Sequence, residues 1–85
     1  MNTTPKGFTI YDTGGGCDAL HKLLGNKHYF LITNEDAQIP NINDICLVGL
    51  YQIDDFNDPI IWKFNNLKEA IAMVENATLY WNEII

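Results

Sequence analysis

The order of hydrophobic and polar residues predicts several short strands followed by one helix. Phe8–Tyr11, His28–Thr33 and Ile60–Phe64 are rich in aromatic and β-branched residues, which favours extended structure. The run Ile45–Tyr51 is the most apolar and predicts a central strand, with Gly49 as the site of a bulge. The Asn-rich, acidic segment from Asn34 to Asp44, which contains Pro40, predicts a loop.

The segment 17–24 fits two patterns. As a helix, it would place Cys17, Leu20, Leu23 and Leu24 on one face. As a strand, it would point its side chains alternately to the two faces of a sheet, with Leu20 and Leu24 on the same face. The short glycine-containing link at 25–27 joins it to another strand, which is a hairpin signal. We therefore favour a strand, a turn and a strand.

One amphipathic helix is predicted at the end of the chain. Asn66 and Glu69 have the spacing of a capping box with Asn as the cap. An apolar stripe follows at helical spacing, made of Leu67, Ala70, Ile71, Val74 and Trp81 and widened by Met73, Ala77 and Tyr80. This stripe requires a sheet face to cover it. The fold class is therefore α+β: a single domain, residues 1–85, with an antiparallel β-meander of four to five strands packed against one C-terminal α-helix and residues 1–6 frayed.

Three consecutive glycines, Gly14, Gly15 and Gly16, separate the first strand from the segment 17–24. Glycine enters positive φ freely, so the run predicts a sharp structural turn between two strands. A phosphate loop is disfavoured, since no Lys-Ser or Lys-Thr follows the glycines and acids flank them at Asp12 and Asp18.

The motif Thr13-Gly14-Gly15-Gly16-Cys17-x-Ala19-Leu20 is followed by Leu31-Ile32-Thr33, Val48-Gly49-Leu50-Tyr51 and a Leu-x-Glu-Ala helix entry at Leu67–Ala70. This pattern resembles a set of short, uncharacterised proteins from phages and bacterial genomes. The resemblance covers most of the chain. It implies a shape and an origin in phages or prophages, and it implies no catalytic residue.

The acidic residues are unevenly placed in a chain of net charge −6. Residues 28–62 hold six acids and no lysine, and the remainder of the chain is neutral. We expect this middle part to bind a basic protein partner; the alternative is a solvated face that only keeps the protein soluble. The expected partner-binding residues are Glu35, Asp36, Asp44, Asp54, Asp55, Asp58 and Trp62, and Tyr51, Phe56 and Tyr80 are further candidate anchors. The absence of arginine and the negative charge argue against nucleic acid as a direct partner.

Two enzyme hypotheses compete with this binding role. Asp12-Thr13-Gly14 resembles the active-site turn of aspartic proteases, which implies a dimer that shares two carboxylates. Too few residues separate Asp12 from Cys46 to form the strands and flap of such an enzyme. Cys17 could instead be a nucleophile with His21 or His28 as its base, although no third, orienting residue is evident. We therefore predict no catalytic residue.

Cys17, His21, His28 and Cys46 have side chains that suit zinc, but their spacing matches no zinc motif. On a strand, Cys17 and His21 would be about 13 Å apart, from a rise of ~3.3 Å per residue. We expect neither a metal nor another cofactor.

The N-terminus lacks the apolar segment of a signal peptide, and no apolar run is long enough to span a membrane. These features predict a cytoplasmic protein without a membrane partner, whose two cysteines stay reduced. The leading hypothesis is a small acidic, non-enzymatic interaction protein, encoded by a phage or prophage, that inhibits a host nucleic-acid-binding or defence protein. The alternatives are a small enzyme that uses Asp12 or Cys17 and a homo-oligomeric structural module.

Overall fold

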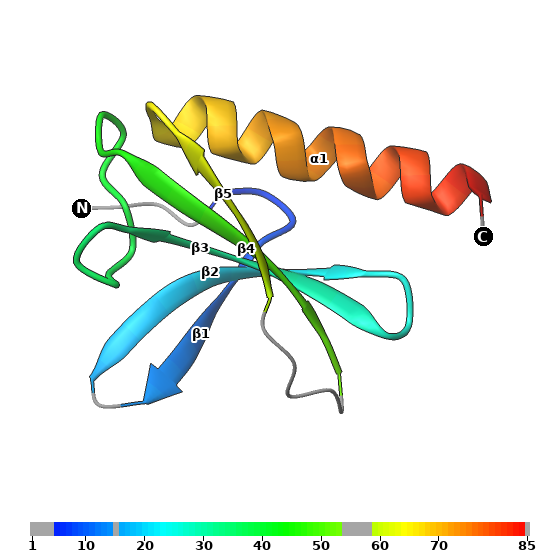
Figure 1. Cartoon of the computed structure of the whole chain (residues 1–85), viewed down its shortest axis with the longest axis horizontal. Helices are drawn as coiled ribbons and strands as arrows, with labels where there is room; N and C mark the ends of the chain where they lie inside the picture. Colours follow the sequence, from blue (N-terminus) through cyan, green and yellow to red (C-terminus); the bar gives the residue numbers. More distant parts are fainter. Residues whose placement is uncertain (1–4, 15, 54–58, 85) are drawn as a thin grey trace.

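A computed structural model describes residues 5–14, 16–53 and 59–84, which form one antiparallel sheet and one helix. The strands are β1 (Thr9–Gly14), β2 (Cys17–Leu24), β3 (His28–Asn34), β4 (Cys46–Gln52) and β5 (Ile60–Phe64), and the helix α1 spans Leu67–Ile84. Every strand pairs with its neighbour in the sequence, in the order β1-β2-β3-β4-β5 (Figure 1). The predicted α+β meander with a C-terminal helix is confirmed.

The segment 17–24 is strand β2, which pairs with β1 on one side and β3 on the other. Gly14 ends β1 opposite Cys17, and Gly16 turns the chain at φ 81°, where an L side chain is disfavoured. Gly15 lies outside the described residues. The register of the β1–β2 pair shifts between Asp12 and Gly14, which is a bulge that bends β1 just before the turn.

The bulge expected at Gly49 is wrong. The pairing of β4 with β3 and with β5 runs through Gly49 without a shift. Gly49 has another role, because the ring of Tyr51 occupies the space that a side chain at this position would need.

The hydrophobic core lies between α1 and one face of the sheet. Successive side chains of a strand point to opposite faces, and this alternation sorts the large apolar residues onto the helix side. That side carries Leu20, Leu24, Phe30, Ile32, Cys46 and Val48, which pack with Ala70 and Val74 of the helix. The buried ring of Phe8 joins this core from the segment that precedes β1.

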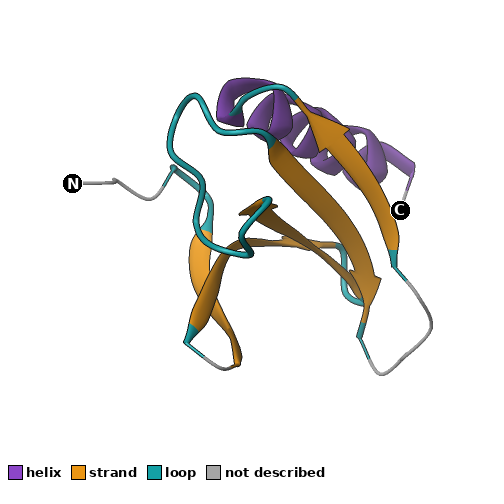
Figure 2. Ribbon diagram, turned by 60° about the vertical axis from the view of Figure 1, so that its left-hand side comes forward, coloured by secondary structure: helices purple, strands orange, loops and turns teal. Residues whose placement is uncertain are grey.

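The helix begins as its sequence predicts. Asn66 Oδ1 accepts a hydrogen bond of 2.9 Å from the Glu69 N–H, and Glu69 Oε2 accepts one of 3.4 Å from the Asn65 N–H. The apolar stripe is narrower than expected, since Tyr80 is 65% exposed. Figure 2 shows that α1 covers only one side of the sheet.

Candidate functional site

The sheet face opposite the helix, here called the open face, carries a line of aromatic side chains. Alternation and the strand register place Tyr11 of β1, His21 of β2, Tyr29 of β3 and Tyr51 of β4 on this face. We call these four residues the aromatic row. Each comes from a different strand, so the row crosses the sheet from its edge to β4.

The rings of the aromatic row contact one another in sequence. The ring centroids of Tyr11 and His21 are 5.3 Å apart with an interplanar angle of 17°, and those of His21 and Tyr29 are 5.2 Å apart. Tyr29 and Tyr51 form the most parallel pair, at 5.3 Å and 11°. Such ring contacts stabilise each other by about 0.5–1.5 kcal/mol per pair beyond simple burial. The sheet therefore holds these rings in a fixed arrangement before any ligand arrives.

The close packing of the rings changes their protonation equilibria. Burial, and then the charges that Tyr11 and Tyr51 would carry, raises the pKa of Tyr29 above its ordinary value. Burial lowers the pKa of His21, because a half-buried imidazolium loses hydration. Both shifts favour the uncharged ring, and Thr9 Oγ1 lies 3.4 Å from His21 Nδ1.

The absence of a side chain at Gly49 leaves room for the Tyr51 ring in the aromatic row. A Cβ at Gly49 would lie 2.6 Å from Tyr51 Cε1 and 3.0 Å from Ile61 Cδ1. These distances are too short for a side chain there, so the Tyr51 ring lies flat against the Gly49 backbone. The half-buried Tyr51 is thereby kept close to the sheet, next to Tyr29.

The acidic residues of the β3–β4 loop have different surroundings. Glu35 is exposed and forms an ion pair of 3.7 Å with Lys63, which itself lies on the open-face side of β5. Asp44 is half buried and accepts hydrogen bonds from Asn34 Nδ2 at 3.3 Å and from the Asn41 N–H at 2.9 Å. Asp36 is exposed, and its N–H donates to Asn34 Oδ1. Asp44 therefore holds the loop together, and of these three acids only Glu35 and Asp36 are exposed.

The remaining expected partner-binding residues do not form one cluster with these. Asp54, Asp55, Asp58 and the candidate anchor Phe56 lie outside the described residues. Trp62 is 38% exposed on the outer strand β5, and its pairing with the core residue Val48 places it on the helix side. The structure therefore separates Trp62 from the face that carries Glu35 and the aromatic row.

The candidate catalytic and zinc residues are also divided between faces. Cys17 and His21 lie four residues apart on β2, on the open-face side, whereas Cys46 and His28 are on the helix side. Cys17 Sγ accepts a hydrogen bond from Gln38 Nε2 at 3.7 Å. Asp12 is exposed within β1, not in a turn. Within the ranges that the structure describes, no three His, Cys, Asp or Glu side chains could hold a metal ion together.

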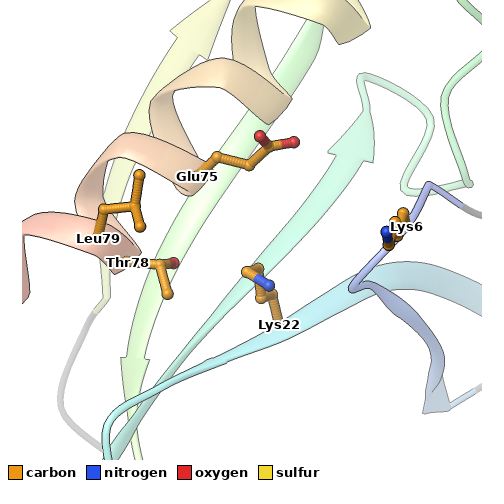
Figure 3. A pocket seen from close by; sticks show the side chains of 5 residues that line it. All are labelled: Lys6, Lys22, Glu75, Thr78 and Leu79. Carbon is orange, nitrogen blue, oxygen red and sulfur yellow. The ribbon is translucent and has the colours of Figure 1, made fainter. Parts of the chain in front are cut away.

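A second feature lies on the other side of the sheet, beside the helix. A hollow of about 300 Å³ is lined by Lys6, Lys22, Glu75, Thr78 and Leu79. Figure 3 shows that the last three come from α1, while Lys22 comes from β2 and Lys6 from the segment before β1. Two lysines therefore line one hollow in a chain whose net charge is −6.

Sequence reasoning treated Tyr51 only as a single anchor and missed the aromatic row. The sequence held a signal for three of the four rings, because His21, Tyr29 and Tyr51 alternate with core residues of the same strand. Alternation along a strand shows on which face of the sheet a side chain lies, but not which side chains of other strands it contacts. Only the register between strands shows that the four rings touch.

Comparisons with protein-family models, curated proteins and solved structures found no match for this chain. No helix in the described part of the chain is both long and apolar enough to cross a membrane.

Proposed function

We propose that this chain is a small interaction protein that binds a basic partner protein through the open face. The aromatic row is the observation that carries this proposal. Tyr11 is 43% exposed and Ile61, on the same face, is 51% exposed, so apolar and aromatic surface faces solvent there. Tyrosine is a residue type that is enriched where protein partners bind.

The chemistry of the row fits arginine and lysine side chains. The face of a tyrosine ring attracts a cation, and a guanidinium group can also stack flat on the ring. The net charge of −6 and the absence of arginine in this chain add a long-range attraction for a basic surface. Exposed carboxylates at Glu35 and Asp36, next to the end of β3, would meet further basic groups.

The test uses a short peptide with several arginines and the same peptide with citrulline in place of arginine. Citrulline keeps the planar group but carries no charge. We expect the arginine peptide to shift the amide resonances of Tyr11, His21, Tyr29 and Tyr51, and the citrulline peptide to bind more weakly. Replacement of Tyr29 by Leu should weaken binding about tenfold.

Tyr80 offers a matched control, because it is 65% exposed on the helix, away from the open face. Tyr80→Leu should leave the affinity for the arginine peptide unchanged. Equal binding of the two peptides, or equal effects of Tyr29→Leu and Tyr80→Leu, would contradict the proposal. Each variant must show the thermal melting of a folded protein before its affinity is compared.

A homo-oligomeric module is a second candidate, and the edge strand β5 favours it. Ile60 and Ile61 of this strand are 58% and 51% exposed, and β5 pairs with β4 on one side only. An apolar edge strand is a template for pairing with another strand. The occupant we consider is β5 of a second copy, because two antiparallel copies paired about Trp62 would set Lys63 opposite Ile61 and bring no like charges directly opposite each other.

Sedimentation velocity over a range of concentrations tests this second candidate. We expect a dimer whose population falls in the variant Ile61→Lys. Tyr11 lies on the opposite edge strand, so Tyr11→Lys is the control and should leave the dimer intact. A monomer at every concentration would rule out self-association through β5.

A further inference from the structure

The hollow beside the helix contains a lysine in an unusual position. Lys22 lies on the helix side of β2, between the buried residues Leu20 and Leu24, and it pairs across the sheet with the buried Phe30. Its ammonium group donates a hydrogen bond of 3.3 Å to the Gly7 carbonyl and lies 5.5 Å from the centroid of the Phe8 ring. No carboxylate of the described residues forms an ion pair with Lys22.

Lys22 is half buried as a residue, its contact with the Gly7 carbonyl is exposed, and its positive charge has no carboxylate partner among the described residues. Lys22 has three donor hydrogens, and the described contacts use one of them, over a long distance. Lys6 lines the same hollow. Glu75 also lines the hollow, and its carboxylate would repel an anion. Two ammonium groups and one carboxylate nevertheless leave a net charge of about +1 at the rim of the hollow. The rim therefore has the charge to hold a single negative group.

The rest of the hollow is suited to hydrocarbon. Leu79 is 65% exposed although it belongs to a helix whose other face packs on the core. The Thr78 hydroxyl donates to the Val74 carbonyl at 2.7 Å, so its donor is satisfied within the helix and its methyl group is left for apolar contact. At about 300 Å³ the hollow has the size of the smaller ligand sites in proteins.

We propose that this hollow binds a small amphipathic monocarboxylate, with the carboxylate held by Lys22 and Lys6 and the hydrocarbon chain against Leu79 and Thr78. The site lies on the helix side of the sheet and is independent of the binding role proposed for the open face. Charge complementarity selects the carboxylate head, and the apolar helix wall selects a tail of several carbons. A neutral or cationic head group would bring no negative charge to Lys22.

The experiment is a titration of the full chain with octanoate, followed by amide chemical shifts and by calorimetry. Three further probes separate the two parts of the ligand: octanamide has a neutral head, octylammonium a cationic head, and acetate has no tail. We expect octanoate to shift the resonances of Gly7, Lys22, Thr78 and Leu79 and to bind more tightly than the other three. Equal binding of octanoate and octylammonium, or shifts elsewhere on the chain, would overturn the proposal.

Lys22→Met tests the head-group contact, since methionine keeps an apolar stem of similar length. Loss of a hydrogen bond to a charged group should weaken octanoate binding about tenfold. Lys63→Met, on the other side of the sheet, is the matched control and should have no effect. If Lys22→Met unfolds, Leu79→Asn replaces it, because Leu79 is exposed and its substitution should weaken octanoate binding while sparing the fold. Unchanged affinity in the folded variant would overturn the proposal.

Discussion

At the scale of single residues, small differences in side-chain volume and charge decide how the open face is built. Gly49 is the clearest case, because the ring of Tyr51 fills the space above it. His21 is another, because it is half buried between two tyrosine rings and its pKa is lowered. Each residue leads to a prediction that concerns stability and not binding.

Gly49→Ala should destabilise the fold by about 1–3 kcal/mol, since the Tyr51 ring must move to admit a Cβ that would lie 2.6 Å from Tyr51 Cε1. Urea denaturation measures this change. A double-mutant cycle with Tyr51→Ala provides the control, because without the ring the cost of Gly49→Ala should become much smaller. An equal cost in both backgrounds would show that the contact with Tyr51 is not the cause.

The stability of the protein should fall as the pH drops below the ordinary His21 pKa of 6.5. The lowered pKa means that the folded chain binds a proton at His21 less readily than the unfolded chain does. The stabilisation is therefore present above 6.5 and is lost as the pH falls through the lowered value. Melting temperatures of the natural protein and of His21→Phe, measured from about pH 8 to about pH 5, check this.

The melting temperature should change less with pH in His21→Phe than in the natural protein. All other residues are the same in the two proteins, so the difference between the curves reports on His21. Parallel curves for the two proteins would contradict the assignment of this pH dependence to His21.

At the scale of elements, local sequence signals predicted whether a segment is a strand or a helix better than they predicted where the segment begins and ends. The aromatic and β-branched runs gave strands, and the Asn66 and Glu69 signal gave the start of α1. β1 runs on through Gly14, further than its residues predict, because the bulge and the pairing with β2 extend it. The ambiguous segment 17–24 became a strand because both neighbouring strands pair with it.

Asn66→Ala should lower the free energy of unfolding by about 1 kcal/mol, since it removes the acceptor of the Glu69 N–H. Asn66→Asp should retain most of the stability, because a carboxylate can accept the same hydrogen bond near the positive end of the helix dipole. Asn76→Ala is the control, since Asn76 is exposed within α1. Chemical denaturation of the three variants measures the differences, and a loss as large at Asn76 as at Asn66 would refute the cap.

At the scale of the whole molecule, the two faces of the sheet carry different sets of residues. One face and α1 form the core, which includes the buried thiol of Cys46. The other face holds the aromatic row. Burial, with a smaller effect of the nearby Asp44 carboxylate, raises the pKa of Cys46 to about 11, and its Sγ donates a hydrogen bond to the Asp44 carbonyl at 3.3 Å. This thiol therefore reports on opening of the entire core.

In the variant Cys17→Ser, labelling of Cys46 with a thiol reagent should be very slow in native buffer and should accelerate with the unfolded fraction as urea is added. Cys46→Ser gives the comparison, because Cys17 is only half buried and should be labelled in the native state. The raised pKa also predicts that stability declines above about pH 9, as the unfolded chain releases the Cys46 proton more readily. Rapid native labelling of Cys46 would contradict a closed core.

The candidate site was less accessible from the sequence than the fold was. The β3–β4 loop contains three acids that look alike in the sequence: Glu35, Asp36 and Asp44. In the structure, Asp44 accepts a hydrogen bond from within the loop, whereas Glu35 forms an ion pair with Lys63 of β5. Charge counting along the chain cannot separate these cases, because they depend on the conformation of the loop and, for Glu35, on a lysine of a distant strand. The same holds for Lys22, whose place beside the hollow depends on α1 and the segment before β1.

By itself, the sequence determined the elements and the fold class, because strand runs, a glycine turn and a helix cap are local signals that short-range sterics and hydrogen bonds enforce. It also determined which residues of each strand share a face, since alternation is a property of the extended backbone. The tertiary structure alone decided which residues of different strands meet. Register brought Tyr11, His21, Tyr29 and Tyr51 into contact, and the helix packs on one face only, so the row lies on the face that the helix does not cover.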